Sequence, residues 1–197
     1  MSAPGATPAD AAWVVIDTPL DPDALAEFCR DLERLYRINP YLEFRAWRRT
    51  GPDAFVTGFR NLSNQREFDL KLECRRDSTR DFTVCYSPGI RRSTRFEIQS
   101  AAGGSRLRIT DDYSGSITPD TAEVDRSLHA WGVALREYLL REQRWGWCLP
   151  WRWYMRRVWV PMKPAARRIT FMILLITLAE VALIALVMAI YWAEHRM

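Results

Sequence analysis

Alternating apolar and polar side chains mark the middle of the chain, between Glu67 and Cys74. The stretch reads EFDLKLEC, in which every second residue is apolar or small and the residues between them are charged. A period of two places all the apolar side chains on one face, which is typical of a β-strand packed on a core. The pattern predicts a half-buried strand over about 66–76.

Six other runs have a similar strand-like character, and turn-forming Gly, Pro and Asn residues separate several of them. These strands are expected over 11–17, 41–49, 54–61, 80–87, 92–99 and 105–113. The turn residues are Gly51–Pro52, Asn61 to Asn64, Pro88–Gly89 and Gly103–Gly104.

Helical spacing of apolar residues appears twice around these strands. Asp21–Pro22 provides a helix start and Asn39–Pro40 an end, and Thr118–Pro119 starts a longer helix that runs to about Gln143. The apolar positions of the first are Leu25, Phe28, Leu32 and Leu35, and those of the second are Val124, Leu128, Trp131, Leu135 and Tyr138. The element order predicts an α+β domain, in which a strongly curved antiparallel sheet of about seven strands wraps around the long closing helix.

The C-terminal part of the chain is apolar without periodicity. Residues 169–192 contain one charged residue, Glu180, and neither Pro nor Gly. At about 1.5 Å per residue, 24 residues span roughly 36 Å, enough to cross a hydrocarbon core of ~30 Å. The alternative is a buried core helix, but core helices are rarely apolar all round for this length. The segment is therefore predicted to be a transmembrane helix.

Charge is distributed unevenly around this span. Residues 1–140 carry 19 basic and 21 acidic side chains, whereas residues 141–168 carry eight basic and one acidic. Because basic flanks stay on the cytoplasmic side, the N-terminal domain is expected in the cytoplasm, anchored in the inner membrane of a bacterium. The first ten residues, MSAPGATPAD, do not resemble a signal peptide. The domain's own net charge of −2 argues against a nucleic-acid partner.

Tryptophan and arginine are concentrated between the domain and the span. Such residues suit the lipid headgroup layer, so membrane lipids are the expected contact. The alternative is aromatic packing beneath the domain or against a partner protein. The expected interface residues are Trp145, Trp147, Trp151, Trp153, Arg156, Arg157 and Trp159.

Glu180 lies near the middle of the predicted span. An acidic side chain at a helix centre is costly in lipid, so Glu180 is expected to contact another membrane-protein subunit or a second copy of the chain. The alternative is a protonated, neutral side chain that faces lipid. The expected organisation is a flexible N-terminus over 1–10, a domain over 11–143, a linker over 144–168, the span over 169–192 and a short outside tail over 193–197.

Residues with catalytic or metal-binding spacing are scarce. The two histidines are His129, expected at the surface, and His195, in the outside tail, and the four cysteines have no paired metal spacing. No Ser or Cys stands in a recognisable nucleophile motif, and there is no glycine-rich phosphate loop. The sequence therefore predicts no catalytic residue, no metal and no cofactor.

The order of elements over 11–143 resembles the START-related superfamily, also called SRPBCC. The stretch LDPDALAEFCRDLERLYRINPYLEF, residues 20–44, is similar to that family's opening helices followed by Asn-Pro and the second strand. The resemblance implies a helix-grip fold with a hydrophobic cavity between the sheet and the closing helix. Members of the family bind lipids, sterols, polyketides or plant hormones, some are enzymes, and others only bind proteins.

Inward-facing positions are the candidates to line such a cavity, although packing is the default role of the helix positions. They are Phe68, Leu70, Leu72, Thr94, Phe96, Asp111, Leu128, Trp131 and Leu135. Strand parity also places Arg92 and Tyr113 inside, where they or Asp111 would orient a ligand's polar head or act as acid or base. The simpler interpretation is that parity breaks near strand ends and that these polar residues lie at a solvated rim.

Three functions remain open at this point. The first is a membrane-anchored domain that binds a hydrophobic ligand of the lipid, quinone or isoprenoid class. The second is a non-enzymatic accessory or assembly subunit of a larger membrane complex. The third is a cyclase- or dehydratase-like enzyme, and this requires an inward acid–base pair.

Overall fold

A computed structural model describes residues 11–88, 91–114 and 121–195. The expected flexible N-terminus, the turn at Gly89, the helix start at Thr118–Pro119 and the last two residues of the tail lie outside the described residues. The chain divides into two compact units, Met1–Pro161 and Met162–Met197.

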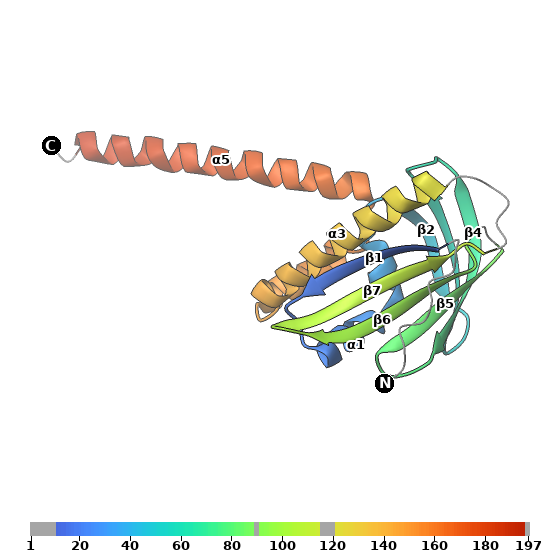
Figure 1. Ribbon diagram of the computed structural model, residues 1–197. Helices are drawn as coiled ribbons and strands as arrows, with labels where there is room; N and C mark the ends of the chain where they lie inside the picture. The colour runs from blue at the N-terminus through green and yellow to red at the C-terminus, as the bar shows by residue number, and fades with distance from the viewer. Residues whose placement is uncertain (1–10, 89–90, 115–120, 196–197) are drawn as a thin grey trace. The chain divides into compact units, whose positions relative to one another are not determined.

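Seven antiparallel strands form one curved sheet in the first unit (Figure 1). Their order is β1-β7-β6-β5-β4-β3-β2, so the first strand of the chain pairs with the last. This confirms the predicted sheet of seven strands. The strands are β1 (Ala11–Thr18), β2 (Leu42–Arg49), β3 (Ala54–Asn61), β4 (Glu67–Arg76), β5 (Asp81–Ser87), β6 (Ser93–Ala101) and β7 (Gly104–Asp112).

Helices follow β1 and β7. The single helical segment expected between the first two strands is two helices, because the Asp31 side chain accepts a hydrogen bond from the backbone N–H of Arg34 and caps a new helix there. The long closing helix is confirmed. The helices are α1 (Pro22–Cys29), α2 (Leu32–Arg37), α3 (Thr121–Trp145), α4 (Leu149–Tyr154), the π-helical turn η1 (Met155–Trp159) and α5 (Pro164–His195).

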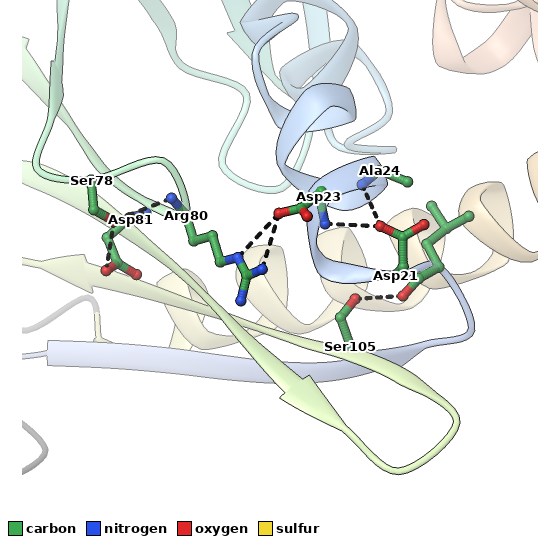
Figure 2. A network of polar contacts seen from close by, with 8 residues as sticks. Asp21, Asp23, Ala24, Ser78, Arg80, Asp81 and Ser105 are labelled. Atoms are coloured by element: carbon green, nitrogen blue, oxygen red, sulfur yellow. Dashed lines mark hydrogen bonds and ion pairs between the residues drawn. The ribbon is translucent and has the colours of Figure 1, made fainter. Parts of the chain in front are cut away.

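A polar network fixes the start of α1 against the sheet (Figure 2). The Asp21 carboxylate accepts hydrogen bonds from the backbone N–H groups of Asp23 and Ala24, 3.0 and 2.9 Å away, as expected of an N-cap. Arg80, between β4 and β5, donates to the Asp23 carboxylate at 3.0 Å, and Ser105 of β7 donates to the Leu20 carbonyl oxygen. α1 is thereby held by two separate parts of the sheet.

Aromatic side chains fill the centre of the interior. The Trp131 ring of α3 lies 5.1 Å from that of Tyr36 in α2 and 5.9 Å from that of Phe96 in β6, and Phe82 stacks on Phe96 at 4.5 Å. Trp131 also donates a hydrogen bond to the Leu35 carbonyl oxygen. Of the nine candidates for the interior, eight are buried and Phe68 is half-buried. These positions therefore lie in the interior of the domain.

α3 packs against β1 at Gly132. A Cβ atom at this position would lie 2.8 Å from Val14 Cγ2, closer than side chains pack. The absence of a side chain at Gly132 lets the helix lie against Val14 and Ile16 of the strand.

The Trp-rich segment packs with the first unit up to Pro161. Met155 and Val160 are buried in the same core as the sheet, and the Trp159 ring lies 5.6 Å from that of Tyr138 on α3. The structure therefore places the boundary between units inside the expected linker 144–168. This packing corresponds to the alternative in which part of the aromatic segment lies beneath the domain.

The second unit consists of α5 and the few residues on either side of it. Pro164–Ala193 is long and apolar enough to cross a membrane, and none of its most apolar window is buried within the chain. Length and composition make this helix a candidate membrane span.

Candidate functional site

The interior contains an ion pair at one end of the sheet. Asp111 of β7, whose side chain is 3% exposed, accepts a hydrogen bond from Arg91 Nη1 at 3.1 Å. The same carboxylate accepts hydrogen bonds from the hydroxyls of Tyr113, at 3.1 Å, and of Thr94. Three donors around one carboxylate compensate for its removal from water.

The network continues from this carboxylate into the aromatic interior. Thr94 is the register partner of Asp111 across β6 and β7, and its hydroxyl bonds the Tyr86 hydroxyl at 2.7 Å. The Tyr86 hydroxyl in turn bonds that of Tyr36. The chain of hydrogen bonds therefore connects β7, β6, β5 and α2, and it ends beside Trp131.

Arg91 covers the outer end of this network. Its guanidinium lies 4.2 Å from the centre of the Tyr86 ring, and 22% of its side chain is exposed. Burial lowers the pKa of Arg91, but the Asp111 carboxylate together with the nearby Tyr86, Tyr113 and Tyr36 outweighs this, so the pKa is raised well above its usual value. Arg91 therefore stays charged and balances the carboxylate.

Burial also sets the state of the three tyrosines. It raises the pKa of Tyr86 to about 12 and raises the pKa values of Tyr36 and Tyr113 well above the usual value for a phenol. All three remain neutral near pH 7. The site therefore offers neutral hydroxyls beside a balanced ion pair, an arrangement suited to hydrogen bonding a neutral polar group.

The inward positions deduced from strand parity are correct in part. Asp111 and Thr94 lie inside and Tyr113 reaches Asp111, so the rim interpretation is wrong for Asp111. Arg92 precedes β6 and is exposed, so parity does fail there.

Three members of the network were not identified from the sequence. Tyr86 shares parity with the buried Phe82 and Val84, which is a usable signal. Arg91 precedes β6, and Tyr36 reaches the site from a helix fifty residues away in sequence. Neither position has a local pattern that points to the site.

The predicted membrane-interface residues, Glu180 and His129 differ in how far their side chains are exposed. The expected interface residues that are exposed are Trp145, Trp147, Trp153, Arg156 and Arg157, and those that are half-buried are Trp151 and Trp159. Glu180 is exposed on α5, and His129 is exposed on α3. Within the described ranges, no group of three or more His, Cys, Asp or Glu residues is arranged to hold a metal ion.

Comparison with known proteins identifies the fold. No family model and no curated protein matches the chain. A START superfamily protein from Mycobacterium smegmatis superimposes with a TM-score of 0.57 and 11% sequence identity, covering 66% of this chain and 97% of that protein. The first unit has the START-like helix-grip fold.

Two further solved structures agree with this START-like assignment. A protein from Thermus thermophilus matches with a TM-score of 0.52 and 15% identity, covering 66% of this chain and 97% of its own. A protein from Deinococcus radiodurans matches with a TM-score of 0.51 and 16% identity, covering 69% and 98% respectively. At these identities the likeness concerns the fold, and function has to be argued from the site.

Proposed function

We propose that this chain is a membrane-anchored START-like domain that binds a hydrophobic ligand with a neutral polar head, of the lipid, quinone or isoprenoid class. The observation that carries the proposal is the buried network of Arg91, Asp111, Thr94, Tyr86 and Tyr36 at one end of an apolar interior. Specific ligand sites combine mostly apolar walls with a few placed polar groups.

The network is weak evidence of a stabilising role. A buried ion pair often contributes less than apolar residues of the same volume, because both charges lose their hydration. A role in orienting a ligand's polar head gives the Arg91–Asp111 pair a function. Because the Thr94 hydroxyl donates to Asp111, Tyr86 donates to Thr94 and Tyr36 donates to Tyr86. The tyrosine oxygens can still accept, so they suit a hydroxyl on the ligand.

α5 supports a membrane location for this binding. A membrane anchor keeps the domain beside the bilayer in which such ligands dissolve. Basic residues predominate on the side of α5 that joins the domain, so the domain is proposed to face the cytoplasm at the inner membrane.

Paired variants test the proposal. Thr94→Val removes one hydroxyl from the network while keeping the side-chain shape. Thr57→Val is the matched control, because it makes the same change at a buried threonine outside the network, whose hydroxyl donates to the Ala46 carbonyl oxygen. The full chain is purified in mild detergent, and bound small molecules are extracted and quantified by mass spectrometry. We expect a stoichiometric apolar compound in the parent and in Thr57→Val, and a several-fold loss in Thr94→Val. Negligible extract from the parent, or equal retention by Thr94→Val, would refute ligand binding at the network.

An accessory or assembly subunit is the second candidate function. The observation in its favour is the aromatic packing of Trp131, Tyr36, Phe96 and Phe82, which occupies the centre where a ligand tail would lie. Under this proposal Glu180 contacts a polar group of another membrane subunit or of a second copy. Glu180→Leu is then expected to insert normally but to lose co-purifying protein or the larger assembly, and an unchanged size in detergent would contradict it. The enzyme alternative gains no support from the tyrosines, whose pKa values move away from neutrality.

A further inference from the structure

The segment that joins the domain to α5 has two different faces. Within α4 and η1, every third or fourth residue turns toward the domain, and the residues between them are exposed. We call five exposed residues of these two elements, together with the exposed Trp147 that precedes them, the Trp–Arg face. It consists of Trp147, Leu149, Arg152, Trp153, Arg156 and Arg157.

The inner face of this segment is part of the domain core. Met155 and Val160 are buried, and Trp159 packs over Tyr138. Burial of Met155 and Val160 in the core, with the Trp159–Tyr138 contact, makes the segment a structural part of the domain. It therefore cannot act as a freely jointed linker.

Polar contacts strengthen this attachment. Glu142 on α3 forms ion pairs with Arg34 Nη2 at 3.0 Å and with Arg156 Nη2 at 3.5 Å. Arg34 also donates to the Tyr138 hydroxyl from Nε and Nη2, at 3.0 and 2.7 Å. The Arg156–Glu142 pair and the buried inner face together hold the segment against the domain.

The Trp–Arg face is both apolar and cationic. Trp147, Leu149 and Trp153 are 78, 70 and 64% exposed, which is unusual for large apolar side chains so close together. Residues 141–168 contain eight basic side chains and a single acidic one, Glu142, which points into the contact with Arg34. Glu142 pairs with one arginine of this face, Arg156, so the carboxylates of the segment do not balance the other two, Arg152 and Arg157.

The short connection between the Trp–Arg face and α5 indicates that the face contacts a membrane. Val160 and the first residue of α5, Pro164, are four residues apart, a distance of at most about 14 Å for a fully extended chain. If α5 crosses a bilayer, as the proposed function requires, the Trp–Arg face cannot move far from the bilayer surface. Tryptophan and arginine are the residues that favour the headgroup layer of an anionic membrane.

We propose that the Trp–Arg face docks on the surface of an anionic bilayer and holds the START-like domain there in one fixed orientation. Trp147, Leu149 and Trp153 enter the headgroup layer, and the arginines contact lipid phosphates. The inference rests on the proposed anchor but not on ligand binding.

Fluorine NMR of the full chain tests this proposal. The tryptophans are replaced biosynthetically by 5-fluorotryptophan, the chain is placed in phosphatidylglycerol-rich nanodiscs that contain headgroup spin-labelled lipid, and each resonance is assigned by a Trp→Phe variant. We expect several-fold greater broadening for Trp147 and Trp153 than for Trp13, which is 58% exposed on β1 and serves as the matched control. Trp192 of α5 reports on the anchor.

Two outcomes separate docking from anchoring. Broadening of Trp192 with Trp147 and Trp153 no more affected than Trp13 would overturn docking and leave the anchor standing. No broadening at any of the four would overturn both. A charge test combines Arg152→Gln with Arg157→Gln, which is expected to reduce the broadening of Trp153. Arg75→Gln, at an exposed position of β4, is expected to leave the broadening unchanged. An equal effect of the two sets of changes would also count against the proposal.

Discussion

Tyr86 joins the charged and the aromatic parts of the interior. Its hydroxyl bonds both Thr94 and Tyr36, and its ring lies beneath the Arg91 guanidinium. Ionising this phenol would place a second negative charge near Asp111 in a site shielded from water. Burial therefore raises the pKa of Tyr86 to about 12, with Asp111 adding to the effect and Arg91 opposing it.

This shift predicts a loss of stability at alkaline pH. The pKa of Tyr86 is higher in the folded chain than the value of about 10 expected when unfolded, so the folded state holds the proton more tightly. The contribution is fully present below pH 10 and is lost as the pH rises toward 12. We expect the thermal midpoint to fall across this range, together with tyrosinate absorbance, and to fall less steeply in Tyr86→Phe. A control variant outside the network, Tyr41→Phe, should follow the parent, and an identical slope in Tyr86→Phe would contradict the assignment.

At the scale of elements, α3 packs against β1 at Gly132, where there is no side chain to keep the helix and the strand apart. In an exposed helix interior, replacing Gly by Ala stabilises by about 1 kcal/mol. Here the new methyl group would meet Val14 Cγ2 at 2.8 Å, and Val14 is β-branched and has little rotamer freedom.

We therefore expect Gly132→Ala to lower the free energy of unfolding despite its better helix propensity. The same change made together with Val14→Ala has room for the methyl group and is expected to be more stable than Val14→Ala alone. Chemical denaturation of the four proteins measures the coupling. Stabilisation by Gly132→Ala in the parent background would show that the helix can shift away from the strand.

Elements with a local signal were predictable and contacts between elements were not. The alternation of β4 and the stripe on α3 each repeat along one element, so the sequence pattern alone identified them. The division between α1 and α2 depends on one capping hydrogen bond at Asp31. The apolar residues keep helical spacing across this point, so the sequence pattern did not reveal the break. In the site, Thr94 and Asp111 followed strand parity, but Tyr36 and Arg91 joined them through contacts that only the folded chain makes.

At the scale of the whole molecule, the position of the domain boundary has a measurable effect. A chain that ends at Pro161 keeps Met155 and Val160 in the core, whereas one that ends at Gln143 loses them and uncovers Tyr138. Because burial of a large apolar side chain contributes about 1.5–3 kcal/mol, the shorter chain should be less stable by at least ~3 kcal/mol.

Denaturant unfolding of the two truncated chains, followed by circular dichroism, measures this difference. Met155→Ala with Val160→Ala in the longer chain should reproduce much of the loss, since it removes the same apolar contacts. Arg157→Ala, on the exposed face, is the control that should leave the midpoint nearly unchanged. Equal midpoints for the two truncations would mean that the segment does not contribute to the core.

The pairing of β1 with β7 means that the sheet cannot close until most of the domain has been synthesised. β1 cannot pair until β7 has been translated, because Ala11 lies opposite Asp112 at the end of the ladder. Long-range pairing of this kind slows folding and leaves strand edges open meanwhile. The apolar residues of α5 are translated only after β7 and α3, so the growing chain can close its sheet before it contains a segment that a membrane would capture.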